Sequence, residues 1–185
     1  IEVDMDLKTF KQNAAKVEEW LAKEYQALRT GKATPVILDG IVVDSYGSKM
    51  KINQLAGVTV EDARTLRIVP WDKGQMKDIE KAIIQSDLGL SVTADDAGLR
   101  VIFPDLTSER RDSLVKVARA KLEDARITLK KEREDMKSAI EKREKEGNIN
   151  EDEERREKEE MQKIVDQMNK TLEEMAEKKE TDIRG

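Results

Sequence analysis

Six basic side chains in the second half of the chain are spaced so that they could bind one ligand together. They recur at intervals of 3, 7, 4, 3 and 4 residues, and they are Lys116, Arg119, Arg126, Lys130, Arg133 and Lys137. On a helix these intervals place the side chains along a single face. Guanidinium and ammonium groups in such a row pair with phosphate oxygens without reading a base sequence. The row therefore indicates a track for a nucleic-acid backbone, and the simpler alternative is a solvated face held by pairs such as Lys130 with Glu134.

Arg110 and Arg111 fall in the first turn of the same expected helix. The N-terminal end of a helix carries partial positive charge, so cations there are unfavourable for helix stability. This placement favours a functional reason for the pair.

Other kinds of chemistry have few residues to use. The chain has no cysteine and no histidine, which excludes disulfides, thiolate catalysis and the usual general base. Residues 30–34 resemble a phosphate-binding loop, but Gln26 stands where a Walker A motif needs glycine, and Ala33 where it needs Ser or Thr. No pair of carboxylates is placed for catalysis in a strand or loop pocket. We expect a protein that is not an enzyme and uses no metal or cofactor.

The composition favours long amphipathic helices. Charged residues make up 41% of the 185 residues and aromatic residues 3%, but the charges alternate with regularly spaced apolar residues. The net charge is −5, with +2 over residues 105–146 and −5 over residues 147–185. No apolar run reaches the roughly 18 residues of a membrane span, and residues 1–4 lack the features of a signal peptide. We expect a cytoplasmic protein, or an organellar one if a targeting segment was removed.

The first expected helix covers residues 6–29. Its apolar residues recur at steps of three and four, with Glu24 as the polar break, and they are Phe10, Ala14, Val17, Leu21 and Leu28. Gly31 would end the helix with a left-handed cap, and Pro35 prevents its continuation.

Between residues 36 and 104 short β-forming runs replace the helical period. The expected strands are residues 41–46, 49–52, 66–69 and 99–103, with a hairpin turn at Gly47 and Ser48. One helix, residues 76–86, carries Ile79, Ala82 and Ile83 on one side.

From residue 105 onward the pattern is helical again. Thr107 caps a helix of residues 108–146, and after a break Asn150 caps a third helix with Glu153 in a capping box. The apolar row of the second helix is Val115, Ala118, Leu122, Ala125, Leu129, Glu132, Met136 and Ala139. That of the third is Met161, Ile164 or Val165, Met168, Leu172 and Met175. Glu132 is a misfit, which suggests that this stretch faces a partner or lies past the packed zone.

Three helices that each carry one apolar stripe predict a bundle. We therefore expect an α+β protein in which residues 1–29 and 105–185 form a long three-helix bundle. Residues 30–104 would form an inserted small β/α/β domain. The chain crosses between the two parts twice, and these crossings predict a hinge at Thr30, Gly31, Pro104 and Asp105.

Seven short segments, in order over nearly the whole chain, match one known family. They read LRTGKATP (28–35), NQLA (53–56), ARTL (63–66), PWDK (70–73), EKAI (80–83), SDLGL (86–90) and LTSERR (106–111). In these segments the chain resembles bacterial-type ribosome recycling factors, and the RTG and SDLG blocks are specific.

The resemblance implies an L-shaped, tRNA-sized molecule whose bundle lies on large-subunit ribosomal RNA near the peptidyl-transferase centre and the inter-subunit bridge. The smaller domain would meet elongation factor G, whose GTP hydrolysis drives the splitting of the post-termination ribosome into subunits. We expect a monomer without a membrane partner. From the family and the basic row together, the expected rRNA contacts are Arg29, Arg110, Arg111, Arg119, Arg126, Lys130, Arg133 and Lys137.

The chain departs from the family in two places. Residues 130–134 read KKERE where an Arg-Asn-apolar-Arg-Arg run is typical, so that Glu134 replaces a basic residue beside Arg133. Residues 48–51 read SKMK in place of a Thr-Pro turn. The first departure bears on RNA affinity and the second on a local turn. The alternative function is a helical adaptor that binds a protein partner through its heptad surface.

Overall fold

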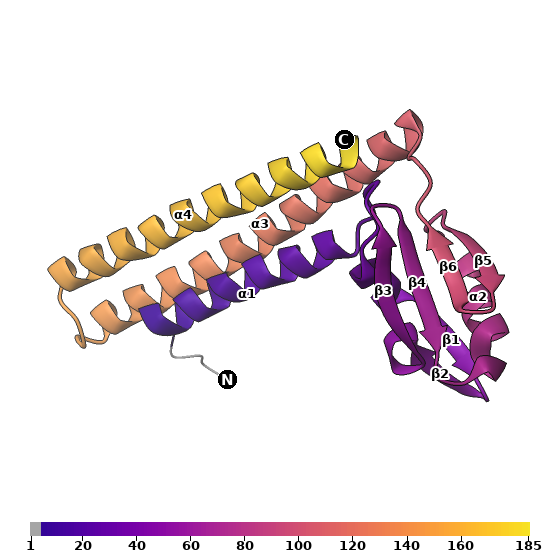
Figure 1. Cartoon of the computed structure of the whole chain (residues 1–185). Helices are drawn as coiled ribbons and strands as arrows, with labels where there is room; N and C mark the ends of the chain where they lie inside the picture. Colours follow the sequence, from indigo (N-terminus) through magenta and orange to yellow (C-terminus); the bar gives the residue numbers. More distant parts are fainter. Residues whose placement is uncertain (1–4) are drawn as a thin grey trace. The chain divides into compact units, whose positions relative to one another are not determined.

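The computed structural model describes residues 5–185 and consists of long helices around an inserted β-rich segment (Figure 1). Helix α1 covers Leu7–Gln26, helix α3 covers Ser108–Lys145 and helix α4 covers Glu151–Arg184. Residues 1–4, on which the expectation about a signal peptide rests, lie outside this description. The predicted α+β class, a long helical bundle with an inserted β/α/β domain, is confirmed. No helix among the described residues is long and apolar enough to cross a membrane.

The chain divides into two compact units. Unit 1 comprises the chain up to Tyr25 together with Lys116–Glu180, and unit 2 comprises Gln26–Val115 with Thr181–Gly185. Unit 2 thus contains the first turns of α3 and the last residues of α4. The sequence predicted two domains with borders at residues 29/30 and 104/105, defined by their expected roles. That division stays a prediction.

Unit 1 is built from α1, α3 and α4, which run alongside one another (Figure 1). The predicted stripe of α1 is buried from Phe10 to Leu21, and the next buried residue is Tyr25. The Tyr25 hydroxyl donates a hydrogen bond of 2.7 Å to the Ala118 carbonyl of α3. Burial raises the pKa of Tyr25 to about 12. A buried polar group thus joins α1 to α3.

The apolar rows of α3 and α4 face this core as predicted, with local exceptions. In α3 the row is buried except at Glu132 and Ala139, which are half-buried, and Ile140 continues it. In α4 Val165 is buried where the sequence left Ile164 or Val165 open, while Met168 and Met175 are half-buried.

Both predicted caps are present. The Arg110 amide donates to Thr107 Oγ1 at 3.1 Å, and the Glu153 amide donates to Asn150 Oδ1 at 2.9 Å. The reciprocal bond of the predicted capping box differs from the prediction, because the Asn150 side-chain amide donates to the Glu153 carboxylate where a capping box uses the backbone N–H. Each cap satisfies an amide that the helix itself leaves unpaired.

Unit 2 contains a hairpin, a four-stranded sheet and one helix. The strands are β1 Val42–Ser45, β2 Ser48–Lys51, β3 Ala56–Asp62, β4 Thr65–Pro70, β5 Ser91–Asp95 and β6 Gly98–Ile102. Strands β1 and β2 pair with each other, and the larger antiparallel sheet has the order β3-β4-β6-β5. Helix α2, Met76–Gln85, packs on β1, β5 and β6, and short 3-10 turns occupy Pro35–Gly40, Ile52–Gln54 and Lys73–Gln75.

Side chains alternate across the larger sheet. Leu66, Ile68, Leu99 and Val101 point into the core of unit 2, which also contains Ile79 and Ile83 of α2. Arg67 and Arg100 pair in register on the opposite face. That face carries an ion network in which Glu61 contacts both arginines and Asp95 contacts Arg67.

Three local predictions need correction. The hairpin turn is Tyr46–Gly47 instead of Gly47–Ser48, because both of these residues adopt positive φ, of 48° and 82°, as a tight two-residue turn requires. Strands β3 and β5 were not predicted. Helix α1 ends at Gln26, and Gly31 has no positive φ, since the chain turns into unit 2 before it reaches that glycine.

Candidate nucleic-acid interface

Three of the predicted basic residues meet in one groove where α3 and α4 pack together. This groove has a volume of about 580 Å³ and is lined by Arg126, Leu129, Lys130, Arg133, Val165 and Asn169. The basic side chains come from α3, and α4 supplies the other wall. The predicted single face of α3 therefore borders its seam with α4.

A second groove continues the seam. It also has a volume of about 580 Å³, and it combines Arg133 and Lys137 of α3 with Arg155 and Lys158 of α4. Because Arg133 lines both grooves, the two meet at its side chain. Four carboxylates share the second groove, those of Glu144, Glu151, Glu154 and Glu159. We call the two grooves together the α3/α4 seam.

The arginines of the row are oriented by side chains of α4. Arg119 pairs with Glu180 at 2.9 Å, and Arg126 pairs with Glu173. The Arg133 Nε donates to Gln162 at 3.0 Å, while another of its nitrogens lies 2.8 Å from Glu134. Lys130 is exposed and forms no ion pair within residues 5–185.

These pairs are at the surface. The side chains of Arg119, Arg126 and Arg133 are 67%, 40% and 32% exposed. Exposed ion pairs contribute about 0–1 kcal/mol to stability. A phosphate that offers the same charge can therefore replace the carboxylate at low cost.

The seam also contains residues that the sequence did not single out. Arg155 and Lys158 lie three positions apart on α4. The net negative charge of this helix gave no indication of a basic pair. Gln162, which binds Arg133, carries no charge that could have marked it. In contrast, Lys116 is exposed but lines neither groove.

Arg29 is placed very differently from the seam residues. It is 4% exposed, and its guanidinium donates to the carbonyls of Thr30, Leu88, Gly89 and Pro104. It also lies 5.4 Å from the ring centre of Phe103. Burial, with a smaller effect of the Arg110 charge, lowers the pKa of Arg29. Its donors are used inside unit 2, which gives no support to a direct phosphate contact by this residue.

Arg110 and Arg111 also have backbone partners in unit 2. Arg110 is exposed and donates to the Asp87 carbonyl at 2.9 Å. Arg111 is half-buried and donates to the Arg184 carbonyl. These bonds supply a structural reason for two cations in the first turn of α3, and their contact with RNA stays a prediction.

The four predicted hinge residues lie in unit 2, and the bonds there tie both crossings down. The Arg29 guanidinium binds the carbonyls of Thr30 and Pro104, and Asp105 forms an ion pair with Arg64. Gly31 has open space around its α-carbon. These contacts give no evidence of motion at the four residues, so the hinge stays a prediction.

Comparison with known proteins shows what the chain is similar to. A family model described as ribosome recycling factor matches residues 21–183. The ribosome-recycling factor of Carboxydothermus hydrogenoformans is 44% identical over 177 residues, which are 96% of each chain. That of Oleidesulfovibrio alaskensis is 45% identical over 163 residues, 88% of this chain and 89% of the relative.

Solved structures give the same result. A solution structure of a ribosome recycling factor is 33% identical with a TM-score of 0.70, over 96% of this chain and 94% of the other. A second match is the Thermus thermophilus ribosome recycling factor, described with E. coli elongation factor G on the E. coli post-termination complex. It is 38% identical with a TM-score of 0.65, over 98% of this chain and all of the other. By sequence and by fold, the chain belongs to the ribosome recycling factor family.

Proposed function

We propose that this chain recycles ribosomes: with elongation factor G and GTP it splits the post-termination ribosome into subunits after the nascent chain has been released. Its membership of the family supports this function, as does the T. thermophilus relative described with elongation factor G on a post-termination complex. In this reading the protein acts in the cytoplasm as a monomer and performs no catalysis of its own.

The α3/α4 seam carries the proposal. Arg126, Lys130, Arg133 and Lys137 would bind phosphates of large-subunit rRNA, with Arg119 adding a contact about two turns beyond the grooves. Guanidinium groups suit this role because they offer several donors to the oxygens of a phosphate. The carboxylates of Glu180, Glu173 and Glu134 hold Arg119, Arg126 and Arg133 in place until phosphates replace them.

The two parts of the chain would then have separate tasks. Residues 1–29 and 105–185 form the rRNA-binding arm, and residues 30–104 face the translocase. Thr30, Gly31, Pro104 and Asp105 would act as the hinge between the two tasks. A Gly31→Pro variant is expected to slow subunit splitting more than it weakens ribosome binding, and equal splitting rates would reject the hinge.

Co-sedimentation with purified large ribosomal subunits tests the seam directly. Lys130→Ala should reduce the bound fraction at low salt, because Lys130 lines the groove and forms no ion pair among residues 5–185, so that its charge is available to a phosphate. Lys131→Ala is the matched control, since Lys131 is the next residue, is exposed and lines neither groove. If both variants bind like the parent, the seam is only a solvated face.

The alternative adaptor function is not favoured. It needs a free heptad surface for a protein partner, but the heptad residues of α3 from Val115 to Leu129 are buried inside the protein.

A further inference from the structure

A separate groove in unit 1 lies between α1 and α3, and the proposed function does not use it. It has a volume of about 400 Å³ and is lined by Asn13, Lys16, Val17, Trp20, Thr128 and Glu132. This volume is within the range of small-molecule sites. The groove contains Glu132, the one carboxylate in the apolar row of α3, and one of the two tryptophans of the chain.

Trp20 offers a planar surface at this groove. The residue is 38% exposed, although tryptophan in a helical bundle is usually packed. The Lys121 ammonium lies 5.9 Å from its ring centre and is itself 3.1 Å from Glu24. The indole is thus held in position by Lys121, while part of it stays open to the groove. An exposed, fixed indole is suited to stacking with a flat ring.

Glu132 supplies a directed acceptor. The Asn13 side-chain amide donates to Glu132 Oε2 at 3.0 Å, and within the described part of the chain no hydrogen bond reaches Oε1. A carboxylate accepts well from two adjacent N–H groups, and among the common bases guanine presents such a pair, at N1 and at its 2-amino group. Asn13 also retains a second amide hydrogen, which the guanine O6 can accept.

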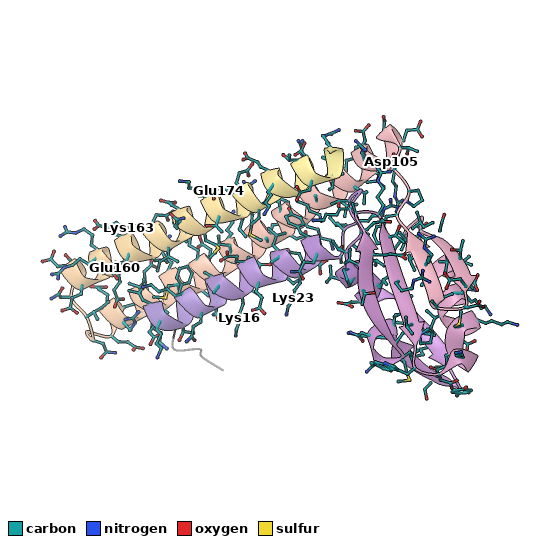
Figure 2. All side chains as sticks on the ribbon, viewed as in Figure 1. Lys16, Lys23, Asp105, Glu160, Lys163 and Glu174 are labelled. Atoms are coloured by element: carbon teal, nitrogen blue, oxygen red, sulfur yellow. The ribbon has the colours of Figure 1, made fainter. Side chains whose placement is uncertain are left out.

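Charge favours a nucleotide over other flat donors. An arginine side chain also stacks on indole and pairs with carboxylates. However, Lys16 lines the groove and the Lys121 ammonium lies 5.9 Å from the indole ring centre, so two cations near the site would repel a guanidinium. Lys16 projects away from α1 (Figure 2), where it can meet a phosphate.

We propose that the α1/α3 groove binds a guanine nucleotide unit. The base stacks on Trp20, its N1–H and 2-amino group donate to Glu132, and its phosphate pairs with Lys16. Asn13 is a positioning residue that orients the carboxylate. The ligand is a free guanine nucleotide or an unpaired guanine in RNA, which share this chemistry. The site stands independently of the α3/α4 seam.

The two tryptophans make the test specific. In the ¹⁵N-labelled full chain, the indole N–H signal of Trp20 reports on the groove, and that of Trp71, an exposed residue of unit 2, is the internal control. Guanosine monophosphate should shift the Trp20 signal saturably and leave Trp71 unchanged. Inosine monophosphate, which lacks the 2-amino group, should bind about tenfold more weakly. Adenosine monophosphate should give no saturable shift.

A matched pair of variants tests the carboxylate. Glu132→Gln should weaken guanosine monophosphate binding about tenfold or more, because the amide replaces an acceptor by a donor. Glu123→Gln, at an exposed position of α3 outside the groove, should have no effect. The remaining signals of each spectrum show whether the variant keeps its fold.

Short single-stranded RNAs distinguish the two sources. A uridine pentamer with a central guanine should bind more tightly than guanosine monophosphate if RNA is the ligand, and no more tightly if the free nucleotide is. Whichever of the two guanine ligands binds more tightly, guanine recognition is supported if the pentamer with a central adenine binds clearly more weakly than the pentamer with a central guanine. Equal shifts with adenine and guanine ligands, no saturable shift with any guanine ligand, or tighter binding of arginine methyl ester would each overturn the proposal.

Discussion

The arginines of the α3/α4 seam and Arg29 of unit 2 are the same chemical group in opposite settings. Arg126 and Arg133 are partly exposed and bind side chains, those of Glu173, Gln162 and Glu134. Arg29 is buried and binds backbone carbonyls of three segments, at Thr30, at Leu88 and Gly89, and at Pro104.

This difference suits the seam arginines to ligand binding and Arg29 to holding the fold of unit 2. A surface carboxylate can be exchanged for a phosphate, because both states are solvated and similarly paired. The Arg29 guanidinium is buried, and the part-buried carbonyls that it binds lose their donor if it is removed. We therefore expect seam variants to lose affinity while they keep stability, and Arg29 variants to lose stability first.

The largest expected effect is that of Arg29→Ala on stability. The substitution leaves the carbonyls of Leu88, Gly89 and Pro104 without their donor, which should cost about 3–4 kcal/mol of unfolding free energy. Chemical denaturation measures it, with Arg133→Ala as the comparison at below about 1 kcal/mol. Equal losses in the two variants would remove the distinction between the two settings.

Gly98→Ala should also destabilise unit 2 while leaving the seam intact. Gly98 has φ of 131°, and an added Cβ would lie 2.2 Å from the Ile68 carbonyl oxygen of the neighbouring strand. We expect a loss of about 2–3 kcal/mol in the same denaturation experiment. Gly57→Ala is the control, because Gly57 has open space and no positive φ. Similar stabilities of the two variants would argue against this close approach.

Acid should weaken unit 2 through the ion network on its open sheet face. Hydrogen bonds from Arg100 and Arg67 lower the pKa of Glu61, and one from Arg67 lowers the pKa of Asp95. Carboxylates with a lowered folded pKa stabilise the protein above their unfolded values, and this contribution is lost as the pH falls through the folded values. As the pH is lowered below about 4.5, the denaturant concentration at the unfolding midpoint should decrease. The decrease should be less steep in Arg67→Met. An unchanged slope would exclude the network as the cause.

The smallest expected effect is a gain of RNA affinity. Glu134 lies 2.8 Å from Arg133 and competes with phosphate for it. Glu134→Gln should therefore tighten binding to large subunits by a few fold at low salt, because it removes one like charge from the path of the phosphate. Glu123→Gln controls for the change in net charge. Weaker binding of Glu134→Gln would mean that Glu134 holds Arg133 in its binding position.

Periodicity carried most of the successful predictions. The apolar rows of α1, α3 and α4, the caps at Thr107 and Asn150 and the single basic face of α3 depend on neighbours within a few residues, which the sequence displays. Strand β3 was missed because Gly57 and its charged end weaken the strand pattern, and β5 because its residues are mostly polar and exposed.

Long-range contacts were beyond the sequence. The sequence near Arg29 does not indicate that its guanidinium binds the carbonyls of residues 88, 89 and 104. Arg29 was therefore predicted to contact RNA. Likewise, the spacing of Arg126 and Arg133 predicts one face, but only the packing of α4 shows that Glu173 and Gln162 border it. Glu132 breaks the apolar row, and from the sequence this stretch was expected to face a partner or to lie past the packed zone. Met136 and Ile140 are buried beyond it, so the packed zone continues, and Glu132 accepts a hydrogen bond from Asn13 of α1.

The salt dependence of binding to large ribosomal subunits tests the central claim most directly. Each phosphate contact contributes roughly 0.7–0.9 to the slope of log K against log salt. Arg133→Ala should lower the slope by about that amount and weaken binding by about 1–3 kcal/mol, while Lys131→Ala should keep the parent slope. An identical slope in Arg133→Ala and the parent would show that the seam does not contact RNA phosphates.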